Sequence, residues 1–566
     1  MAQQHPRKTF ALRDPNTVMR LERLGSFHQS RLSFMRILTR RMAAQGWTFT
    51  RPEFAVDARG VGHAVYCAHT PERSYSLVAF AHDLPADQRS DRVIAQAWDS
   101  TFTLFDGVPT QDDIERLRQN IPVQEAGRVR RSELSVSRAN RSVRLWEHVV
   151  SRLAQGQQPD QAMIAQVGYL MRTTAVYGSG KLGAADREAT AARPEFAAPF
   201  QIEMLSVFLT RAFVRDLVQH MAQMRGGDAA VQLDRSIARS IGIGNSTGLG
   251  MAPFLLNHPT LFHNWIAARE TALARVRAVR KASSQEVAMF QDLVARVILS
   301  ADQWQSAHPI QIDKLTALRG DLARLSRHLE RADLSQDHPW DGLFDWAAAQ
   351  LGIDAQECLA SVMLEPYGAL VDDLCAQMSD DEVGPVSIDG AMTVGALRDI
   401  LARDYAWAMT IDWADKACCA RAWYVSEEKL EPRLGERFSE PIAPYEQPLA
   451  PGRDASALFD ALREWGADTS LAEFLRAHPA HRHMVRRTQI VDRAPYAEIR
   501  DNTISAALLP IDMLRCKLSF FGATHFDPRS DRWVRICLFG NAPYPEELCV
   551  RNADDWVYPP LDARGA

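Results

Sequence analysis

The hydrophobic residues change their spacing near Ser132, and this change constrains the fold more than any other feature of the sequence. Before Ser132, short segments alternate polar and apolar residues with the period of two that is typical of half-buried strands. After it, long stretches repeat apolar residues about every 3.6 positions, which is the period of an amphipathic helix. The sequence therefore predicts a mainly α fold: a large helical central domain, a small α+β N-terminal domain and an α+β C-terminal region.

The N-terminal domain is expected to comprise residues 1–130. Apolar residues recur at helical spacing over residues 16–45, and Gly46 is expected to end this helix. Strands are expected at residues 62–68, 75–81 and 98–105, because these segments alternate or are rich in β-forming residues.

Residues 131–425 are expected to form the helical core domain. The ranges with helical spacing are 132–155, 160–174, 200–224, 228–241, 259–305, 311–331 and 338–378. Five prolines then fall within residues 426–453, which favours an extended connector. Residues 454–566 are expected to form the α+β C-terminal region, with candidate strands at 511–521 and 532–539.

Charge and cysteine content restrict the class of protein. The 65 Lys and Arg residues against 70 Asp and Glu leave a net charge of −5, which disfavours a surface-wide attraction to nucleic acid or anionic membrane. The first 20 residues lack the apolar core of a secretory signal, and no apolar run is long enough to span a bilayer. The eight cysteines form no C-x-x-C pair. We therefore expect a soluble cytoplasmic protein with reduced thiols.

A glycine-rich segment, residues 172–183, concentrates groups that a connection between helices does not need. It supplies donors suited to a carboxylate or phosphate from Arg172, Ser179 and Lys181, and it includes Tyr177. It does not match the phosphate-binding P-loop, because Leu182 follows the lysine. The alternative is a tight connection between two helices.

A second glycine-rich segment, residues 242–250, is read as a polar loop before the next helical range. Asn245, Ser246 and Thr247 could hydrogen-bond a ligand there, and His258 follows close by. The segment lacks the flanking features of a dinucleotide fingerprint, so no cofactor is expected. No metal is expected either, since His258 has no carboxylate at a recognisable ligand spacing. A plain glycine-rich connection remains the alternative.

Two other sets of arginines are weaker candidates for binding a ligand or nucleic acid. Arg211 and Arg215 share a helical face between the two glycine-rich segments. The arginine-rich segment 128–144 is expected to be a salt-bridged helix, with an RNA-binding surface as the alternative.

These patterns favour an enzyme that acts on a small anionic organic substrate by acid/base chemistry, of the lyase or isomerase type. Tyr177 and Lys181 are the predicted proton-transfer pair. The predicted substrate-binding residues are Arg172, Ser179, Asn245, Ser246, Thr247 and His258. Two alternatives stay open: a non-catalytic helical protein that binds a ligand or partner, and an RNA- or nucleotide-associated factor. We expect no membrane partner, regard nucleic acid as a disfavoured partner, and leave assembly into a homo-oligomer open.

Overall fold

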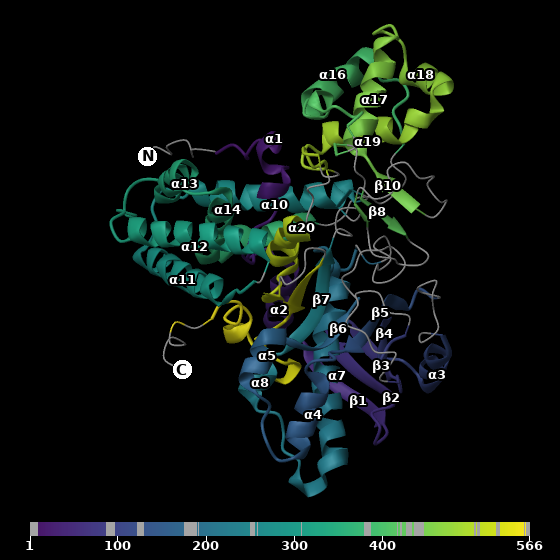
Figure 1. The fold of residues 1–566 in the computed structure, drawn as a ribbon, viewed down its shortest axis with the longest axis vertical. Coiled ribbons are helices and arrows are strands. Elements are labelled where there is room, and N and C mark those ends of the chain that lie inside the picture. Colours follow the sequence, from purple (N-terminus) through teal and green to yellow (C-terminus); the bar gives the residue numbers. More distant parts are fainter. Residues whose placement is uncertain are drawn as a thin grey trace. The chain divides into compact units, whose positions relative to one another are not determined.

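The computed structural model divides the described chain into two compact units (Figure 1). Unit 1 comprises Met1–Phe27, Gly248–Phe290 and Arg327–Cys516, and unit 2 comprises His28–Thr247, Gln291–Ser326 and Lys517–Ala566. The structure describes all residues except 1–9, 86–96, 121–129, 175–189, 191, 249–254, 257, 307, 379–386, 416, 419–421, 426–432, 435–445, 503–504, 506–509, 528–532, 560 and 562–566. It describes only the backbone at 120, 246–248, 422–425, 433–434, 446–449, 510, 525–527 and 533. The predicted domain borders at 130, 425 and 453 stay predictions.

A nine-stranded mixed sheet forms the core of unit 2. Its strand order is β1-β2-β3-β4-β5-β6-β7-β12-β11, with antiparallel pairs from β1 to β6 and a parallel pair between β6 and β7. The strands are β1 Thr48–Val56, β2 Gly62–His69, β3 Ser74–Ala81, β4 Ser100–Asp106, β5 Glu133–Arg141, β6 Tyr169–Thr173, β7 Gly242–Gly248, β11 His525–Asp527 and β12 Trp533–Leu538.

The prediction of a mainly α fold is wrong, because this sheet extends far beyond the N-terminal segment. β5 and β6 occupy ranges predicted as helix, and β7 occupies a range predicted as a loop. Every side chain of β5 is buried, but most of these side chains are polar or charged. The strand therefore lacks the apolar pattern by which a buried strand is predicted. β7 has the sequence GIGNSTG, whose glycines have low strand propensity. The predicted strands at 62–68, 75–81 and 98–105 are confirmed as β2, β3 and β4.

Helices cover both faces of the sheet in unit 2. α7 contacts strands from β2 to β6, and its Phe213 packs edge-on against Phe102 of β4 at 5.6 Å between ring centroids. On the opposite face, Leu117 of α3 packs with Val136 of β5 in a buried cluster. The helices of unit 2 are α2 Phe34–Ala44, α3 Gln111–Asn120, α4 Trp146–Ala154, α5 Gln161–Val167, α7 Gln201–Gly226 and α8 Arg235–Ser240.

Several local predictions need correction. The helix expected over residues 16–45 is replaced by α1 Pro15–Val18 and the shorter α2. The arginine-rich segment 128–144 is not a helix, since most of its described residues form β5. The candidate strand 511–521 is helical, with α20 Pro510–Cys516 followed by a π-helical turn at Lys517–Phe521. The helix predicted at 200–224 is confirmed as α7.

Gly242 marks a close approach between β7 and β12. A Cβ atom at this position would lie 2.3 Å from the carbonyl oxygen of Leu538 and 2.6 Å from Sγ of Cys537. We therefore expect Gly242→Ala to destabilise unit 2 by about 1 to 3 kcal/mol through overpacking. Gly320→Ala is the matched control, because a Cβ there meets no atom within 4 Å and alanine favours the helix. Thermal unfolding of both variants checks this, and an equal or higher midpoint for Gly242→Ala would contradict it.

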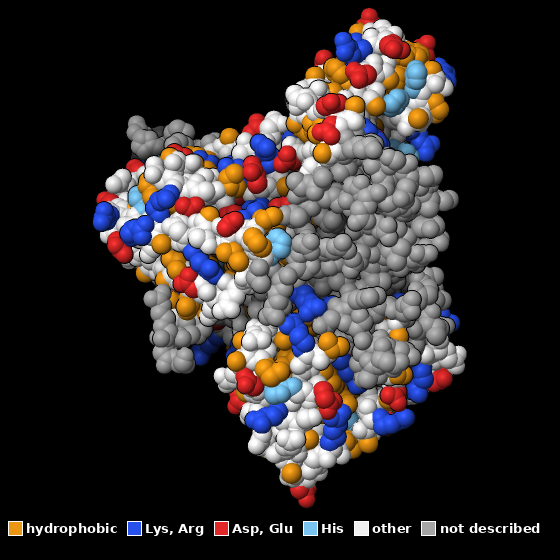
Figure 2. Space-filling view, in the orientation of Figure 1, with side chains coloured by type: hydrophobic (Ala, Val, Ile, Leu, Met, Phe, Trp, Pro, Cys, Tyr) orange, Lys and Arg blue, Asp and Glu red, His pale blue; other side chains and the backbone are white. Residues whose placement is uncertain are grey.

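The surface of the described residues carries mixed charge. Figure 2 shows acidic and basic side chains spread over the visible face rather than gathered by sign. In the part of the chain that the structure describes, no helix is both long and apolar enough to cross a membrane.

Unit 1 is mainly helical, with a short sheet of order β10-β8-β9. Its elements are α1, α10 Pro259–Arg277, α13 Pro339–Gln350, α14 Ile353–Val362, α15 Gly368–Val371, α16 Val394–Asp404, α17 Pro451–Arg463, α18 Leu471–Ala477, α19 Arg482–Arg493, α20, β8 Ala422–Val425, β9 Arg433–Leu434 and β10 Glu446–Leu449. The division of the chain crosses α11 Ser284–Gln303 and α12 Pro309–Leu329.

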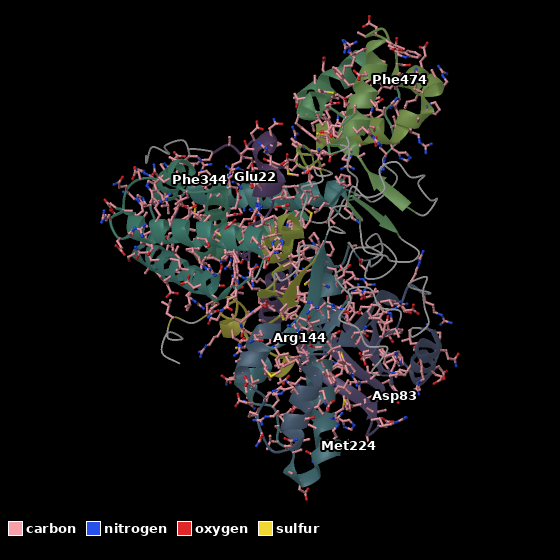
Figure 3. The ribbon with its side chains drawn as sticks, viewed as in Figure 1. Glu22, Asp83, Arg144, Met224, Phe344 and Phe474 are labelled. Carbon is pink, nitrogen blue, oxygen red and sulfur yellow. The ribbon has the colours of Figure 1, made fainter. Side chains whose placement is uncertain are left out.

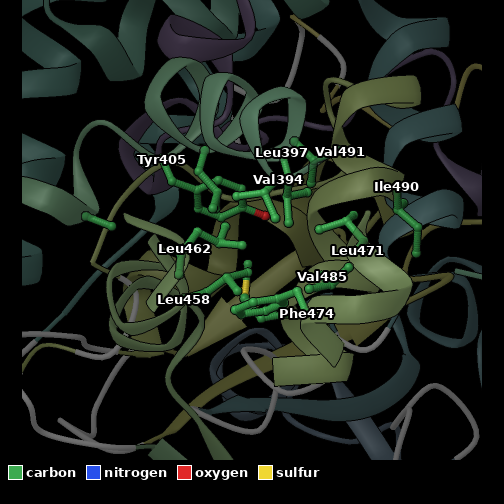
Figure 4. Packing of buried hydrophobic residues seen from close by; sticks show 14 of the residues in the cluster. Val394, Leu397, Tyr405, Leu458, Leu462, Leu471, Phe474, Val485, Ile490 and Val491 are labelled. Carbon is green, nitrogen blue, oxygen red and sulfur yellow. The ribbon is translucent and has the colours of Figure 1, made fainter. Parts of the chain in front are cut away.

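Within unit 1, the helices α16 to α19 share an apolar core (Figure 4). Fully buried residues from all four helices meet there, and Phe474 of α18 is one of them (Figures 3 and 4). An isolated β-bridge joins Thr393 to Ser470 and ties the start of α16 to the start of α18. We call these four helices the helical module.

Candidate functional site

β6 and β7 bring the starts of the two glycine-rich segments together in unit 2. The strands are parallel neighbours, and Arg172 lies opposite Gly244 in their register. Thr173 is the last residue of β6, so the first two residues of the first glycine-rich segment lie in the strand next to β7. The second segment is therefore a strand over Gly242–Gly248, not the loop that its glycines indicated.

Asn245 is the predicted site residue with the best defined surroundings. Its side chain is completely buried in β7. Its Nδ2 donates to the carbonyl oxygen of Thr173 at 2.9 Å, and its Oδ1 accepts from Nζ of Lys517 at 3.3 Å. Asn245 thus joins the end of β6 to a buried lysine from a distant part of the sequence.

Lys517 is the residue of this site that sequence reasoning missed. It is completely buried and begins the π-helical turn Lys517–Phe521, a deviation that is frequent at functional sites. Its Nζ lies 4.6 Å from the ring centroid of Phe521, a cation–π contact. The sequence did hold a signal, since Lys517 is a lysine within an otherwise largely apolar run.

Arginines from β5 and β6 add positive charge near this end of β6. Arg172 of β6 lies opposite Asn140 of β5 in the strand register. Because side chains alternate along a strand, Arg138 lies on the same face of the sheet as these two residues. Arg138 and Arg172 are 2% and 8% exposed, so both guanidinium groups are in surroundings of low dielectric constant. The guanidinium of Arg138 also lies over the ring of Trp98, 5.7 Å from its centroid.

The neighbouring polar groups hold the strand ends in place. Asn140 accepts from the backbone N–H of Asp99 at 2.8 Å, and Asp99 accepts from the backbone N–H of Arg141 at 2.9 Å. The guanidinium of Arg141 lies 3.7 Å from the Asp99 carboxylate and 4.7 Å from the centroid of the Trp146 ring. Arg144, labelled in Figure 3, follows on the segment between β5 and α4.

The described residues on either side of segment 175–189 are anchored in unit 2. On one side, the backbone N–H of Thr174 donates to the carbonyl oxygen of Arg138 at 2.9 Å. On the other side, Arg193 makes a bidentate pair with Asp106 at 2.9 and 2.6 Å, and Tyr75 donates to Glu195. The segment that carries the predicted catalytic pair therefore starts next to Arg138.

The other predicted site residues fall into three groups. Tyr177, Ser179 and Lys181 lie outside the described residues. Ser246 and Thr247 continue β7 beyond Asn245, and only their backbone is described. His258 belongs to unit 1, where it is the residue before α10, and not to the unit that holds Arg172 and Asn245.

Arg211 and Arg215 have structural contacts. Arg211 donates to three backbone carbonyl oxygens, and Arg215 pairs with Glu546 and Asp216. Among the described residues, no cluster of three or more His, Cys, Asp or Glu side chains could hold a metal ion.

Comparison of the chain with protein-family models, with curated proteins and with solved structures finds no match.

Proposed function

We propose that the chain is an enzyme that acts on a small organic substrate bearing a carboxylate or phosphate. The observation that carries this proposal is the buried contact of Asn245 with Lys517 and with the end of β6. Burying an ammonium group is costly, so a lysine at such a position favours a functional role. The proposed site is the region around the ends of β5, β6 and β7 in unit 2.

Anion binding is the role we assign to Arg172 and Arg138. Two guanidinium groups on one face of β5 and β6 are diagonal neighbours across the strand pair. A guanidinium presents a planar fork of donors that matches a carboxylate or phosphate. In a largely buried setting such a charge-assisted hydrogen bond is roughly twice as strong as a neutral one.

Proton transfer is the role we assign to Tyr177 and Lys181. Tyr177 follows Thr174 by three positions, so its Cα lies within about 11 Å of that of Thr174 whatever the path of the chain. Lys181 follows by seven positions, which gives a limit of about 25 Å. A lysine close to arginines has its charged form disfavoured and can exchange a proton near neutral pH. Such a pair next to a bound carboxylate suits a lyase or isomerase.

We also propose that the enzyme works in the cytoplasm. The described cysteines 67, 358, 375, 418, 516, 537 and 549 are all free thiols, which supports a reducing compartment. Burial raises the pKa of Cys537 to about 12, so this thiol stays protonated and donates to the carbonyl oxygen of Gly168 at 2.9 Å.

The test begins with a ligand screen on the full chain. Thermal shifts measured against a library of carboxylates and phosphates should reveal a selective ligand, because a ligand at 100 times its Kd stabilises the folded state by about 2.7 kcal/mol. We expect Arg172→Met to weaken the binding of this ligand by roughly 10- to 100-fold, which is the effect of losing a hydrogen bond to a charged group. Arg59→Met, on an exposed turn of the same unit, should leave the affinity unchanged.

Turnover separates catalysis from binding. With a substrate identified, we expect Lys181→Met to lower kcat by about 100-fold or more with the fold intact. Near-normal turnover in both Lys181→Met and Tyr177→Phe would refute the assigned roles. A ligand that depends on Arg172 but is never converted would favour the non-catalytic alternative.

A further inference from the structure

We propose that one surface of the helical module binds single-stranded nucleic acid. This surface, the basic face, is formed by Arg476, His478, His481, Arg482, Arg486 and Arg493 on α18, the turn after it and α19. It lies in unit 1 and does not depend on the proposed enzyme site. The net charge of −5 disfavours nucleic acid as a partner for the surface as a whole, so such binding requires a local surplus of positive charge.

The basic face has that surplus. Residues 470–493 contain five arginines, three histidines and no lysine, against only Glu473 and Asp492. Of these arginines, Arg487 pairs with the buried Glu498, which leaves four for the basic face. The other two helices of the module are balanced, since α16 and α17 each carry two arginines and two aspartates. Histidine side chains lie next to basic side chains on the module in Figure 2.

Three arginines of α19 lie close together around the helix axis. Arg482, Arg486 and Arg493 follow one another at i, i+4 and i+11, which places them within about 40° around the helix. Of the buried valines of the same helix, Val491 lies on the opposite side, and Val485 lies about 60° around the helix from Arg482. Of these three, Arg482 and Arg493 are exposed to solvent and Arg486 is partly exposed.

Three of these arginines are available for a partner. Arg476, Arg482 and Arg493 are exposed, and the described residues provide none of them with an ion pair. On α16 and α17, by contrast, Arg403 lies 2.7 Å from Asp404 and Arg453 lies 3.1 Å from Asp454. The surplus on α18 and α19 is thus not neutralised as it is on the neighbouring helices.

Aromatic rings close to these arginines in sequence contact one another. Trp465 is partly exposed, and its Nε1 donates to Nε2 of His478 at 3.3 Å. His478 stacks on Phe474 with ring centroids 5.0 Å apart, and its ring lies 6.3 Å from that of His481. Rings next to arginines are the combination that single-strand binding proteins use for bases and phosphates. An acidic protein would need the arginines but not the rings, so we favour a single strand.

Fluorescence anisotropy of the full chain with a labelled single strand of about 20 nucleotides tests the proposal. The triple variant Arg476→Gln, Arg482→Gln and Arg493→Gln should bind at least tenfold more weakly at low salt. The slope of log affinity against log salt should fall by about 2, because each phosphate contact on a single strand contributes about 0.7. His478→Ala should weaken binding without changing this slope.

The matched control removes three positive charges from the balanced helices through Arg398→Gln, Arg453→Gln and Arg463→Gln. It should bind the strand as the unaltered chain does, and circular dichroism should show both triple variants folded. Equal loss of affinity in both triple variants would overturn the proposal. So would the absence of strand binding at low salt, or equally tight binding of polyglutamate, which would indicate an acidic protein partner instead.

Discussion

Replacing Arg13 with methionine is expected to lower the stability of unit 1 by about 3 kcal/mol at neutral pH, because it leaves two buried carboxylates without their shared partner. Arg13 makes bidentate pairs with Glu270 of α10 and Glu357 of α14, at distances from 2.7 to 3.0 Å. The two carboxylate side chains are 0% and 1% exposed. Arg269 keeps two hydrogen bonds to Glu270 and Arg23 keeps one to Glu357, so the loss is partial.

The destabilisation should shrink as the pH falls. Burial alone would raise the pKa of Glu270, but the guanidinium groups of Arg13 and Arg269 outweigh it and lower the pKa to about 2. The stability that this group contributes is therefore complete above its ordinary pKa of 4.5 and is lost as the pH falls towards 2. Without Arg13, burial disfavours the charged form of the two carboxyl groups, so they take up protons at a higher pH. The stabilities of the Arg13→Met variant and the unaltered chain should therefore approach each other in acid.

Hydrogen exchange of peptides from α10 and α14 is the suitable measurement, since a chain of two units need not unfold in one step. Arg20→Met is the control: Arg20 is half exposed and lies 3.7 Å from Asp501, a surface pair worth less than about 1 kcal/mol. Adding Glu357→Gln to Arg13→Met should recover part of the loss by removing one buried charge. If Arg13→Met exchanges no faster than Arg20→Met, the network does not stabilise the unit as described.

The sequence predicted the elements whose residues alternate or repeat cleanly. β2 to β4 were predicted because their segments alternate or are rich in β-forming residues, and α7 because apolar residues repeat at helical spacing over residues 200–224. β5 failed this test because its nine buried residues include serines, arginines and an asparagine, so burial leaves no apolar pattern in its sequence. β7 failed because glycine carries no strand signal, and its glycines serve close packing against Tyr169 and β12.

The candidate site was predicted only in part for a related reason. Donor-rich segments pointed to Arg172 and Asn245, which the structure places on neighbouring strands. Lys517 lies 272 positions from Asn245 along the chain, and no local pattern reports a contact over such a separation. His258 was assigned by nearness in sequence, yet it belongs to the other unit.

Arg211 shows how the fold supports the proposed site. It is 2% exposed, and its guanidinium donates to the carbonyl oxygens of Arg239, Ile241 and Ala542 at 2.7 to 2.9 Å. These carbonyls lie just before β7 and just after β12, so one side chain holds both strand ends. Burial lowers the pKa of Arg211, and the ring of Tyr544 lies 4.0 Å from the guanidinium.

We expect Arg211→Met to destabilise unit 2 by about 3 kcal/mol, since three buried carbonyl groups lose charged donors while the cost of burying the charge disappears. Arg211→Lys should be no more stable than Arg211→Met, because lysine keeps the buried charge but cannot reach three carbonyls at once. Hydrogen exchange should rise in peptides covering residues 239–248 and 533–542, and a ligand bound near Asn245 should bind more weakly.

Arg215→Lys provides the contrast, because Arg215 stacks on the same Tyr544 ring at 4.2 Å but pairs with the carboxylates of Glu546 and Asp216. An ammonium can keep the ion pairs but loses the planar stacking on Tyr544, so this variant should destabilise unit 2 by about 1 kcal/mol, clearly less than Arg211→Lys. The two lysine variants thus separate charge from hydrogen-bond geometry. If Arg211→Lys is as stable as the unaltered chain, the positive charge at this position, and not the three-way hydrogen bonding, is what holds β7 beside β12.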